Sequence, residues 1–392
     1  MNPLKQLGKD SVLYAFGEVI ARGISFSLLP VYTRIFTPAE YGNVELISVL
    51  TSFVGTILSM GMDSAQSMYF VKAKSDGKSE QALIVSSILQ WRLLWGSGVV
   101  LLSTLLAPLL NALFFNGRLS WEYFAVAFLG MLFVQIMSQS REVMRLLYRP
   151  WSFISVTIAQ SLITSTSVLI AVLVFNLGIF GFFLGLASGS LAAGIYGWYC
   201  IRNFLAFDRL HNKLWPHLLR FGAPLVPGEI ALYCMDSADR WFIQLYEGDE
   251  VLGIYSIGLK FALLMLLPVE AFRRSSWPIA LDSMFGRGGH TIIKNIALLY
   301  TGGSTSLIIV LTLASPWLVK LFTAPPFHNS WPIVGIMAWQ PLFYGFLLIA
   351  SSGIWKSEKT YLRSYLIGIT SILGLGFNWL MVPVYGIGEQ RT

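Results

Sequence analysis

Charged residues lie within segments that are otherwise apolar and long enough to cross a bilayer, and eight of them are candidate site residues. A charge at the depth of the hydrocarbon costs about 2.5 kcal/mol or more, so such side chains face protein or a water-filled cavity and mark candidate functional sites. The cations of this set are candidates for binding an anionic substrate group in a cavity, and the acids are candidates for ion coupling or gating. The cations are Arg22, Arg92, Arg240 and Lys260, and the acids are Glu18, Asp63, Asp236 and Asp239.

The segment around Arg240 has the most pronounced polar face. Residues 222–246 are long enough to span a membrane as a helix, since about 20 residues suffice. On a helix, Glu229, Asp236 and Arg240 fall on one face, and the last two are i,i+4 partners. With Asp239 they leave a surplus of acid, which suits a proton or a sodium ion as coupling ion. The alternative is an ion pair with a structural role only.

The other charged residues differ in how they are compensated locally. Glu18 and Arg22 are i,i+4 neighbours in the first span, where they form either a structural pair or a phosphate-binding or gating site. Lys260 has no acid three or four positions away and is expected to be the least compensated cation. It either lines a cavity or extends to the membrane interface. Arg92 could equally have a structural or a functional role. Asp63 lies at the end of the second span, and the simpler interpretation is that it is an ordinary polar residue at a helix end.

The composition indicates an integral membrane protein. Of the 392 residues, 55% are hydrophobic and 12% are charged, whereas soluble domains have about 25% charged residues. The four His residues are scattered without ligand spacing, and Cys200 and Cys234 lie in apolar segments, so we expect no metal site and no disulfide framework. No nucleophile, Walker-type or paired-acid motif at catalytic spacing is present in the sequence. We therefore expect that the protein is not an enzyme and binds no cofactor.

Eleven apolar segments predict an all-α polytopic membrane protein. They are 11–33, 43–64, 82–108, 122–140, 151–175, 179–201, 222–246, 253–281, 292–322, 331–355 and 364–384. With a cytoplasmic amino terminus, most of the 27 Lys and Arg residues fall in cytoplasmic segments and few fall outside, which is the positive-inside distribution. This distribution accounts for the net charge of +7 without nucleic acid as a partner.

Short motifs recur at an offset of about 210 residues, as Gly42 and Gly253 do in the segments that follow spans one and seven. The offset predicts two pseudo-symmetric lobes of six transmembrane helices with parallel topology, residues 1–211 and 212–392. The second lobe is expected to lack its last helix, because the sequence ends at Thr392 where a twelfth apolar segment is due. We expect a truncated lobe and an external carboxyl terminus.

Several of these motifs resemble those of polysaccharide-unit exporters. In order and spacing they are similar to the O-antigen flippase branch of the multidrug/oligosaccharidyl-lipid/polysaccharide (MOP) exporter superfamily, and the resemblance extends over the whole chain. The stretches that carry it are Leu28–Gly42, Gly61–Ala65, Pro224 with Ser237–Arg240, Gly253–Tyr255, and Asn378–Gly386.

The resemblance implies twelve helices in two lobes and a flippase that moves an undecaprenyl-pyrophosphate-linked oligosaccharide across the bacterial inner membrane. Its partners would be this lipid-linked oligosaccharide, membrane lipids and other polysaccharide assembly proteins, with H⁺ or Na⁺ as candidate coupling ion. A pyrophosphate with attached sugars cannot cross hydrocarbon, so we expect a hydrated cavity with cations for the phosphates and with amides or aromatic rings for the sugars.

Other functions remain open at this level. A drug/cation antiporter or a lipid II flippase would share the superfamily, and the missing twelfth span is also what an inactive, truncated transporter would show. A membrane-bound polymerase or ligase is less consistent with the sequence, because it requires a large outer loop with catalytic residues and all the outer segments are short.

Overall fold

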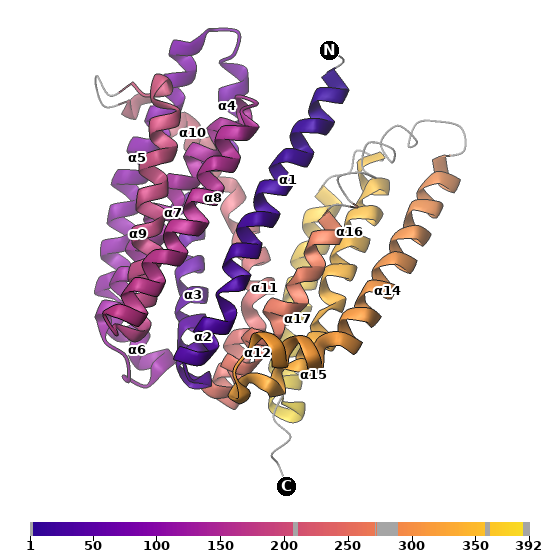
Figure 1. The fold of residues 1–392 in the computed structure, drawn as a ribbon. Helices are drawn as coiled ribbons and strands as arrows, with labels where there is room; N and C mark the ends of the chain where they lie inside the picture. Colours follow the sequence, from indigo (N-terminus) through magenta and orange to yellow (C-terminus); the bar gives the residue numbers. More distant parts are fainter. Residues whose placement is uncertain (1–2, 207–210, 271, 273–288, 357–360, 387–392) are drawn as a thin grey trace. The chain divides into compact units, whose positions relative to one another are not determined.

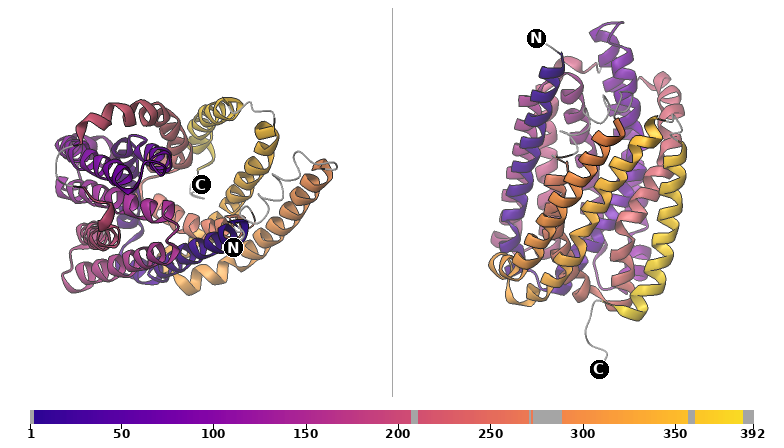
Figure 2. Two further views of the ribbon diagram at one scale, coloured as in Figure 1. Left: turned by 90° about the horizontal axis from the view of Figure 1, so that it is seen from above. Right: turned by 90° about the vertical axis from the view of Figure 1, so that its right-hand side faces the viewer.

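The computed structural model describes residues 3–206, 211–270, 272, 289–356 and 361–386. Over these residues the secondary structure is helical and contains no β-strand. The chain divides into two compact units, which are treated separately below. The first unit comprises residues 1–28 and 46–233, and the second comprises residues 29–45 and 234–392. Within each unit the long helices run side by side (Figures 1 and 2).

The first unit is a bundle of long helices. Its helices are α1 (Pro3–Ser27), the second part of α3 (Pro38–Ser59), α4 (Met62–Lys72), α5 (Lys78–Leu105), α6 (Ala107–Phe115), α7 (Trp121–Leu146), α8 (Pro150–Leu169), the π-helical turn η1 (Ile170–Val174), α9 (Gly178–Cys200), α10 (Trp215–Gly222) and the beginning of α11 (Val226–Glu247). Short 3₁₀ turns connect some of them: η2 (Arg202–Phe204), η3 (Asn212–Leu214) and η4 (Ala223–Leu225). In this bundle α9 packs along α7 and α8, α1 packs along α8, and α5 packs along α7.

Small residues let these helices approach one another closely. A Cβ atom placed on Gly185 of α9 would lie 2.5 Å from the Cα of Val168 on α8, and one on Gly130 of α7 would lie 3.3 Å from the Cα of Ala187 on α9. Such contacts are how helices associate in lipid, where the hydrophobic effect provides little attraction between them. The glycines of α9 therefore fix the spacing of α7 and α8 in the bundle.

A break in the helix between α3 and α4 determines where the polar residues of α4 lie. Met60 and Gly61 both adopt left-handed backbone conformations, with φ of 48° and 68°, and two such residues in succession end a right-handed helix. A new helix then starts at Met62, so that Asp63 and Ser67 lie one turn apart on the same face of α4.

The second unit also consists of helices over its described residues. They are α2 (Leu29–Ile35), the beginning of α3, the remainder of α11, α12 (Asp249–Ala262), α14 (Gly289–Phe322), α15 (Trp331–Met337), α16 (Trp339–Lys356) and α17 (Tyr361–Tyr385), with the 3₁₀ turns η5 (Leu263–Met265) and η6 (Pro325–Ser330). Helix α15 packs against α12 and α14, and α16 packs against α14 and α17. Buried Met265, Tyr300 and Leu342 belong to the apolar core that joins these helices.

Two glycines permit a reciprocal contact between α3 and α12 in the second unit. A Cβ on Gly42 would lie 2.8 Å from the carbonyl carbon of Asp249, and a Cβ on Gly253 would lie 2.8 Å from the carbonyl carbon of Pro38. The two glycines are separated in the sequence by the same interval as Pro38 and Asp249, and this interval is the offset of the predicted repeat. Residues at equivalent positions of the predicted repeat thus contact each other reciprocally, as in a two-fold interface.

The helices have the length and the surface of membrane-spanning segments. Among the described residues, seven helical segments are long and apolar enough to cross a bilayer: Pro38–Lys72, Lys78–Leu105, Trp121–Leu146, Pro150–Val174, Gly178–Cys200, Asp249–Glu270 and Thr291–Phe322. Large apolar side chains such as Leu101 and Leu298 are exposed on them, as expected where lipid is the solvent. The predicted all-α class of polytopic membrane protein is confirmed.

Other parts of the predicted architecture stay predictions. These are the count of eleven spans, the two lobes of six helices each and the division of the chain at residue 211. The end of the predicted span 253–281 and the carboxyl-terminal residues 387–392, on which the expected truncation depends, lie outside the described residues.

Candidate functional site

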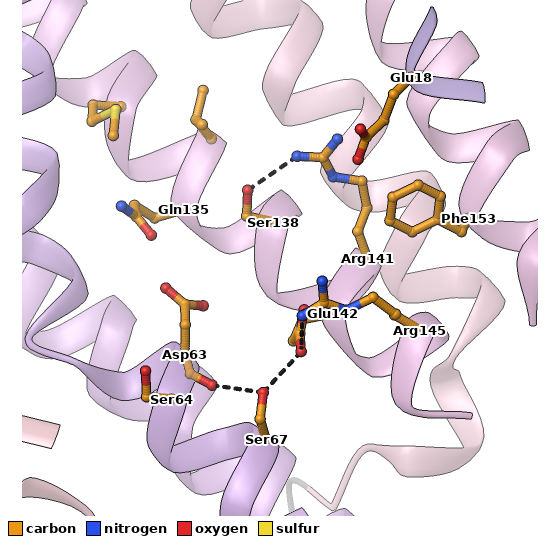
Figure 3. A pocket seen from close by; sticks show the side chains of 12 residues that line it. Glu18, Asp63, Ser64, Ser67, Gln135, Ser138, Arg141, Glu142, Arg145 and Phe153 are labelled. Atoms are coloured by element: carbon orange, nitrogen blue, oxygen red, sulfur yellow. Dashed lines mark hydrogen bonds and ion pairs between the residues drawn. The ribbon is translucent and has the colours of Figure 1, made fainter. Parts of the chain in front are cut away.

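The first unit contains a polar cavity of about 500 Å³ among its helices (Figure 3). Helix α7 contributes most of its wall, α4 faces α7, and α1 and α8 contribute one residue each. The lining residues are Glu18, Asp63, Ser64, Ser67, Met131, Val134, Gln135, Ser138, Arg141, Glu142, Arg145 and Phe153. The α7 residues recur three or four positions apart, so that one face of this helix carries them all.

Two arginines of α7 lie in the wall of the cavity. The guanidinium of Arg141 donates to the hydroxyl of Ser138 at 3.3 Å and lies 5.9 Å from the centre of the Phe153 ring, with the carboxylate of Glu18 nearby (Figure 3). Arg145 is paired with Glu142 at 2.6 Å. Both guanidinium groups are thus fixed by neighbours, and both carry further N–H donors.

Asp63 is joined to the buried Arg92 on α5. Arg92 donates to Asp63 Oδ1 at 2.5 Å, and to both the backbone carbonyl and the side-chain oxygen of Gln135 at 2.8 Å. Only 1% of the Arg92 side chain is exposed, against 45% for Asp63. Arg92 therefore lies behind the wall of the cavity, where it positions Asp63 and Gln135.

Hydroxyl and amide groups complete the polar wall. Ser67 donates to Glu142 at 2.8 Å, and the Gln135 amide donates to the backbone carbonyl of Gly55 at 3.0 Å. Such groups donate to and accept from the hydroxyls of a sugar, while arginine side chains bind phosphate or carboxylate oxygens. The cavity is chemically suited to a ligand rich in hydroxyl groups that also carries charge.

The second unit contains a separate cluster of charges around Glu45 of α3. One carboxylate oxygen of Glu45 lies 3.3 Å from Nε of Arg240 on α11, and the other lies 3.6 Å from Nζ of Lys260 on α12. Lys260 also donates to the hydroxyl of Tyr41, and its ammonium group lies 4.6 Å from the centre of the Tyr41 ring. A single carboxylate is therefore shared between two cations.

Asp239 is part of the same face of α11. Its Oδ2 accepts a hydrogen bond from Tyr255 of α12, and its Oδ1 is buried without a hydrogen-bond partner among the described residues. Tyr255 also contacts the sulfur of Met337 at 3.6 Å. Asp236, one turn before Arg240, is exposed.

The structure brings some of the predicted residues together and separates others. In the first unit, Asp63 and Arg92 form an ion pair, and Glu18 lines the cavity. Arg22 is exposed and does not contribute to the cavity wall. The expectation that Lys260 lacks a compensating acid is wrong, because Glu45 on another helix supplies one.

Several residues of these sites do not stand out in the sequence. Glu45 is an acid inside the predicted span 43–64, and its position within an apolar stretch is a signal equivalent to that of Asp239. Arg141 and Glu142 lie at the end of a predicted span, where charged residues are ordinary, and only the packing of α4 against α7 shows that they face a cavity.

Comparison with known proteins identifies related sequences. A family model described as polysaccharide biosynthesis protein matches residues 7–272. The chain is also similar to Lsg locus putative protein 1 of Haemophilus influenzae, with 23% identity over 291 residues. The match covers 70% of this chain and 66% of that protein, so the chain spans slightly less than two thirds of the length of this relative.

Solved structures with the same fold are transporters. One is lipid II flippase MurJ in an inward closed conformation, which is 16% identical, with a TM-score of 0.73 over 96% of this chain and 82% of that chain. Another is an inward-facing multidrug resistance MATE family transporter of the MOP superfamily, which is 13% identical, with a TM-score of 0.71 over 94% of this chain and 88% of that chain. At these identities the likeness concerns the fold.

Proposed function

We propose, from the premise that this chain belongs to the polysaccharide biosynthesis protein family, that it is a flippase for a lipid-linked oligosaccharide. Family and fold together confirm the resemblance to MOP-superfamily polysaccharide transporters that the motifs indicated. The substrate we propose is an undecaprenyl-pyrophosphate-linked sugar unit. It would move from the cytoplasmic to the periplasmic leaflet of the bacterial inner membrane, with the amino terminus of the chain in the cytoplasm.

The observation that carries this proposal is the polar cavity of the first unit. It is lined mainly by α4 and α7, which belong to segments of membrane-spanning length and composition. Gln135 and Ser138 of its wall lie within the predicted span 122–140, where polar side chains are costly and are retained when they serve a polar ligand or an aqueous path. A wall of serine hydroxyls, one amide and two guanidinium groups fits a sugar unit joined to phosphate.

The residues of the cavity divide into proposed roles. Ser67, Ser138 and Gln135 would bind sugar hydroxyls, and Arg141 would bind an anionic group of the substrate. Arg92 would act as a positioning residue through Asp63 and Gln135, since it is enclosed by protein. Coupling to H⁺ or Na⁺ through the acidic residues of either unit is part of the proposal.

Export of cationic drugs is a second candidate function that one observation favours. Three carboxylates line the cavity, those of Glu18, Asp63 and Glu142, and carboxylates suit a cationic ligand. Two of them are neutralised by ion pairs, Asp63 with Arg92 and Glu142 with Arg145. We therefore rank drug export below oligosaccharide transfer.

Complementation tests the two functions against each other. The chain is expressed in a bacterium that makes the lipid-linked sugar unit but lacks its own flippase, and surface polysaccharide is measured. We expect the chain to restore surface polysaccharide and Arg141→Ala to reduce it about tenfold or more, because a charge-assisted hydrogen bond is lost. Lys74→Ala, in the exposed turn between α4 and α5, is the matched control and should complement as the parent chain does.

The same plasmids are introduced into a strain that lacks its drug exporters. Restored resistance to cationic drugs without restored polysaccharide, in a strain with a matching sugar unit and confirmed membrane insertion, would overturn the flippase proposal in favour of drug export. Restored polysaccharide without resistance would reject drug export.

A further inference from the structure

We infer that the α10 basic face, which consists of the exposed side chains of Lys213, His217 and Arg220 together with Lys72 of α4, binds the phosphate headgroup of an anionic phospholipid of the surrounding bilayer. All four residues belong to the first unit, and none of them lines the cavity described above. The inference goes beyond the proposed function, because the lipid bound here is not the transported substrate.

Helix α10 is held against α4 and α5 by its apolar face. Leu218 is buried in an apolar cluster with residues of both helices, and Trp215 donates to the backbone carbonyl of Ser87 on α5 at 3.0 Å. At the other end of α10, a Cβ atom on Gly222 would lie 2.9 Å from the carbonyl carbon of Gly61, so the two backbones are in contact. The position of α10 on the first unit is therefore fixed at both of its ends.

The opposite face of α10 carries the basic residues. Lys213 lies in the turn η3 that leads into α10, and His217 and Arg220 follow at intervals of four and three positions, which places the three on one side of the helix. All three are exposed, and none of them has an ion-pair partner among the described residues. An ammonium group, a guanidinium group and an imidazole N–H donor are therefore available to an anionic ligand.

The ring of Tyr69 on α4 connects Lys72 to this face. The ammonium group of Lys72 lies 5.5 Å from the centre of the Tyr69 ring, and the centre of the His217 ring lies 4.7 Å from it. Phe221 packs edge-on against the same ring, at 5.9 Å between the centres. A cation of α4 and the basic face of α10 thus belong to one continuous surface.

Exposed apolar side chains beside the cations favour a lipid over a soluble anion. Phe221 is 36% exposed, and Met68, one turn before Lys72 on α4, is 40% exposed. The α10 basic face also lies where two membrane segments end, because Lys72 ends the segment Pro38–Lys72 and α10 immediately precedes the predicted span 222–246. Basic residues at such a position bind headgroup phosphates, while apolar neighbours contact the acyl chains.

Native mass spectrometry, which counts bound lipids, tests the inference. The full chain in detergent is titrated with phosphatidylglycerol, with phosphatidylcholine and with glycerophosphoglycerol, the phosphatidylglycerol headgroup without acyl chains. We expect tighter binding of phosphatidylglycerol than of the other two. Each cation near an anionic surface contributes about fivefold in affinity, so the double variant Lys213→Gln/Arg220→Gln should bind phosphatidylglycerol about tenfold to thirtyfold more weakly, and Lys72→Gln about fivefold more weakly.

The matched control is the double variant Lys74→Gln/Lys78→Gln. It removes two positive charges from the same end of the first unit, in the turn between α4 and α5 and at the start of α5, but leaves the α10 basic face intact. This variant should bind phosphatidylglycerol as the parent chain does. Thermal unfolding of each variant without added lipid establishes that it is folded.

Three results would overturn the inference. Equal weakening by the two double variants would mean that general surface charge attracts the lipid, without a site on α10. Equal affinity for phosphatidylglycerol and phosphatidylcholine would exclude a role of the cations in lipid binding. Binding of glycerophosphoglycerol as tightly as phosphatidylglycerol would identify a site for a soluble phosphate instead of a lipid.

Discussion

The guanidinium of Arg92 is enclosed by the first unit and is neutralised by Asp63 at 2.5 Å. Removing one partner of a buried ion pair leaves an uncompensated charge, which is strongly destabilising. Because Asp63 is partly exposed and Gln135 continues to accept from Arg92, we expect Asp63→Ala to lower the free energy of unfolding by about 2 kcal/mol, less than for a fully buried pair. Thermal unfolding in detergent, monitored by tryptophan fluorescence, measures the change.

The matched comparison is Glu142→Ala, which breaks an ion pair in the same cavity wall. Its partner Arg145 is 59% exposed, so water can solvate the released charge and the loss should be within about 1 kcal/mol. Equal destabilisation by the two variants would contradict the positioning role of Arg92.

At the scale of single residues, the sequence identifies which charges lie at membrane depth but not which of them meet. Hydropathy places Arg92, Arg240 and Lys260 inside apolar segments, and each is part of a polar cluster in the structure. Their partners Asp63 and Glu45 come from other helices, so the i,i+3 and i,i+4 rules could not find them. Local spacing within a helix therefore predicted Lys260 to be uncompensated, and the packing of α3 against α12 reverses that prediction.

At the scale of elements, the contact between α3 and α12 depends on two glycines. A Cβ on Gly253 would overlap the backbone carbonyl of Pro38, and the backbone cannot rotate away as a side chain can. We expect Gly253→Ala to destabilise the chain by about 1–3 kcal/mol, the usual cost of overpacking. Gly302→Ala on α14 is the control, because no atom lies within 4 Å of a Cβ there and alanine favours the helix by up to about 1 kcal/mol.

Thermal unfolding of the two variants side by side tests this packing. Opposite shifts of the unfolding temperature support the close contact, with Gly253→Ala lowered and Gly302→Ala unchanged or raised. An unchanged temperature for Gly253→Ala would mean that α3 and α12 are farther apart than the structure has them.

The helices themselves could be predicted, since runs of apolar residues are decisive for membrane segments. Their interruptions could not. The break at Met60 and Gly61 rests on two left-handed backbone conformations, and only the second of these residues is a type that commonly adopts them. The turn matters for the site, because it starts α4 where Asp63, Ser64 and Ser67 face α7.

At the scale of the whole molecule, the recurring motifs acquire a physical meaning. Gly42 and Gly253 were matched in the sequence as equivalent positions, and in the second unit each leaves room for the backbone of the other's helix. A sequence repeat that places glycine at the equivalent position of both helices allows the same close backbone contact to form twice where the helices cross.

The orientation of the chain in the membrane is the prediction that bears on all others, because a flippase must take its substrate from the cytoplasmic leaflet. Helix α5 has 28 residues and is about 42 Å long at 1.5 Å per residue, more than the roughly 30 Å of hydrocarbon. The turn between α4 and α5 lies at one end of α5, and α6 leads from its other end to the turn before α7. These two turns therefore face opposite sides of the membrane, and Figure 1 shows them at opposite ends of the first unit. The first turn contains Lys74, between Lys72 and Lys78, so the positive-inside rule places it in the cytoplasm.

In a background in which both native cysteines are replaced by alanine, we expect Ser75→Cys to react with a membrane-impermeant maleimide only after the membrane is opened, and Arg118→Cys to react in intact spheroplasts. The reverse pattern would mean that the chain is inserted with the opposite orientation. Arg141 and Arg145 lie near the end of α7 that is farther from the turn between α6 and α7. In the inverted chain these cavity arginines would lie on the periplasmic side, where they could not receive a substrate made in the cytoplasm.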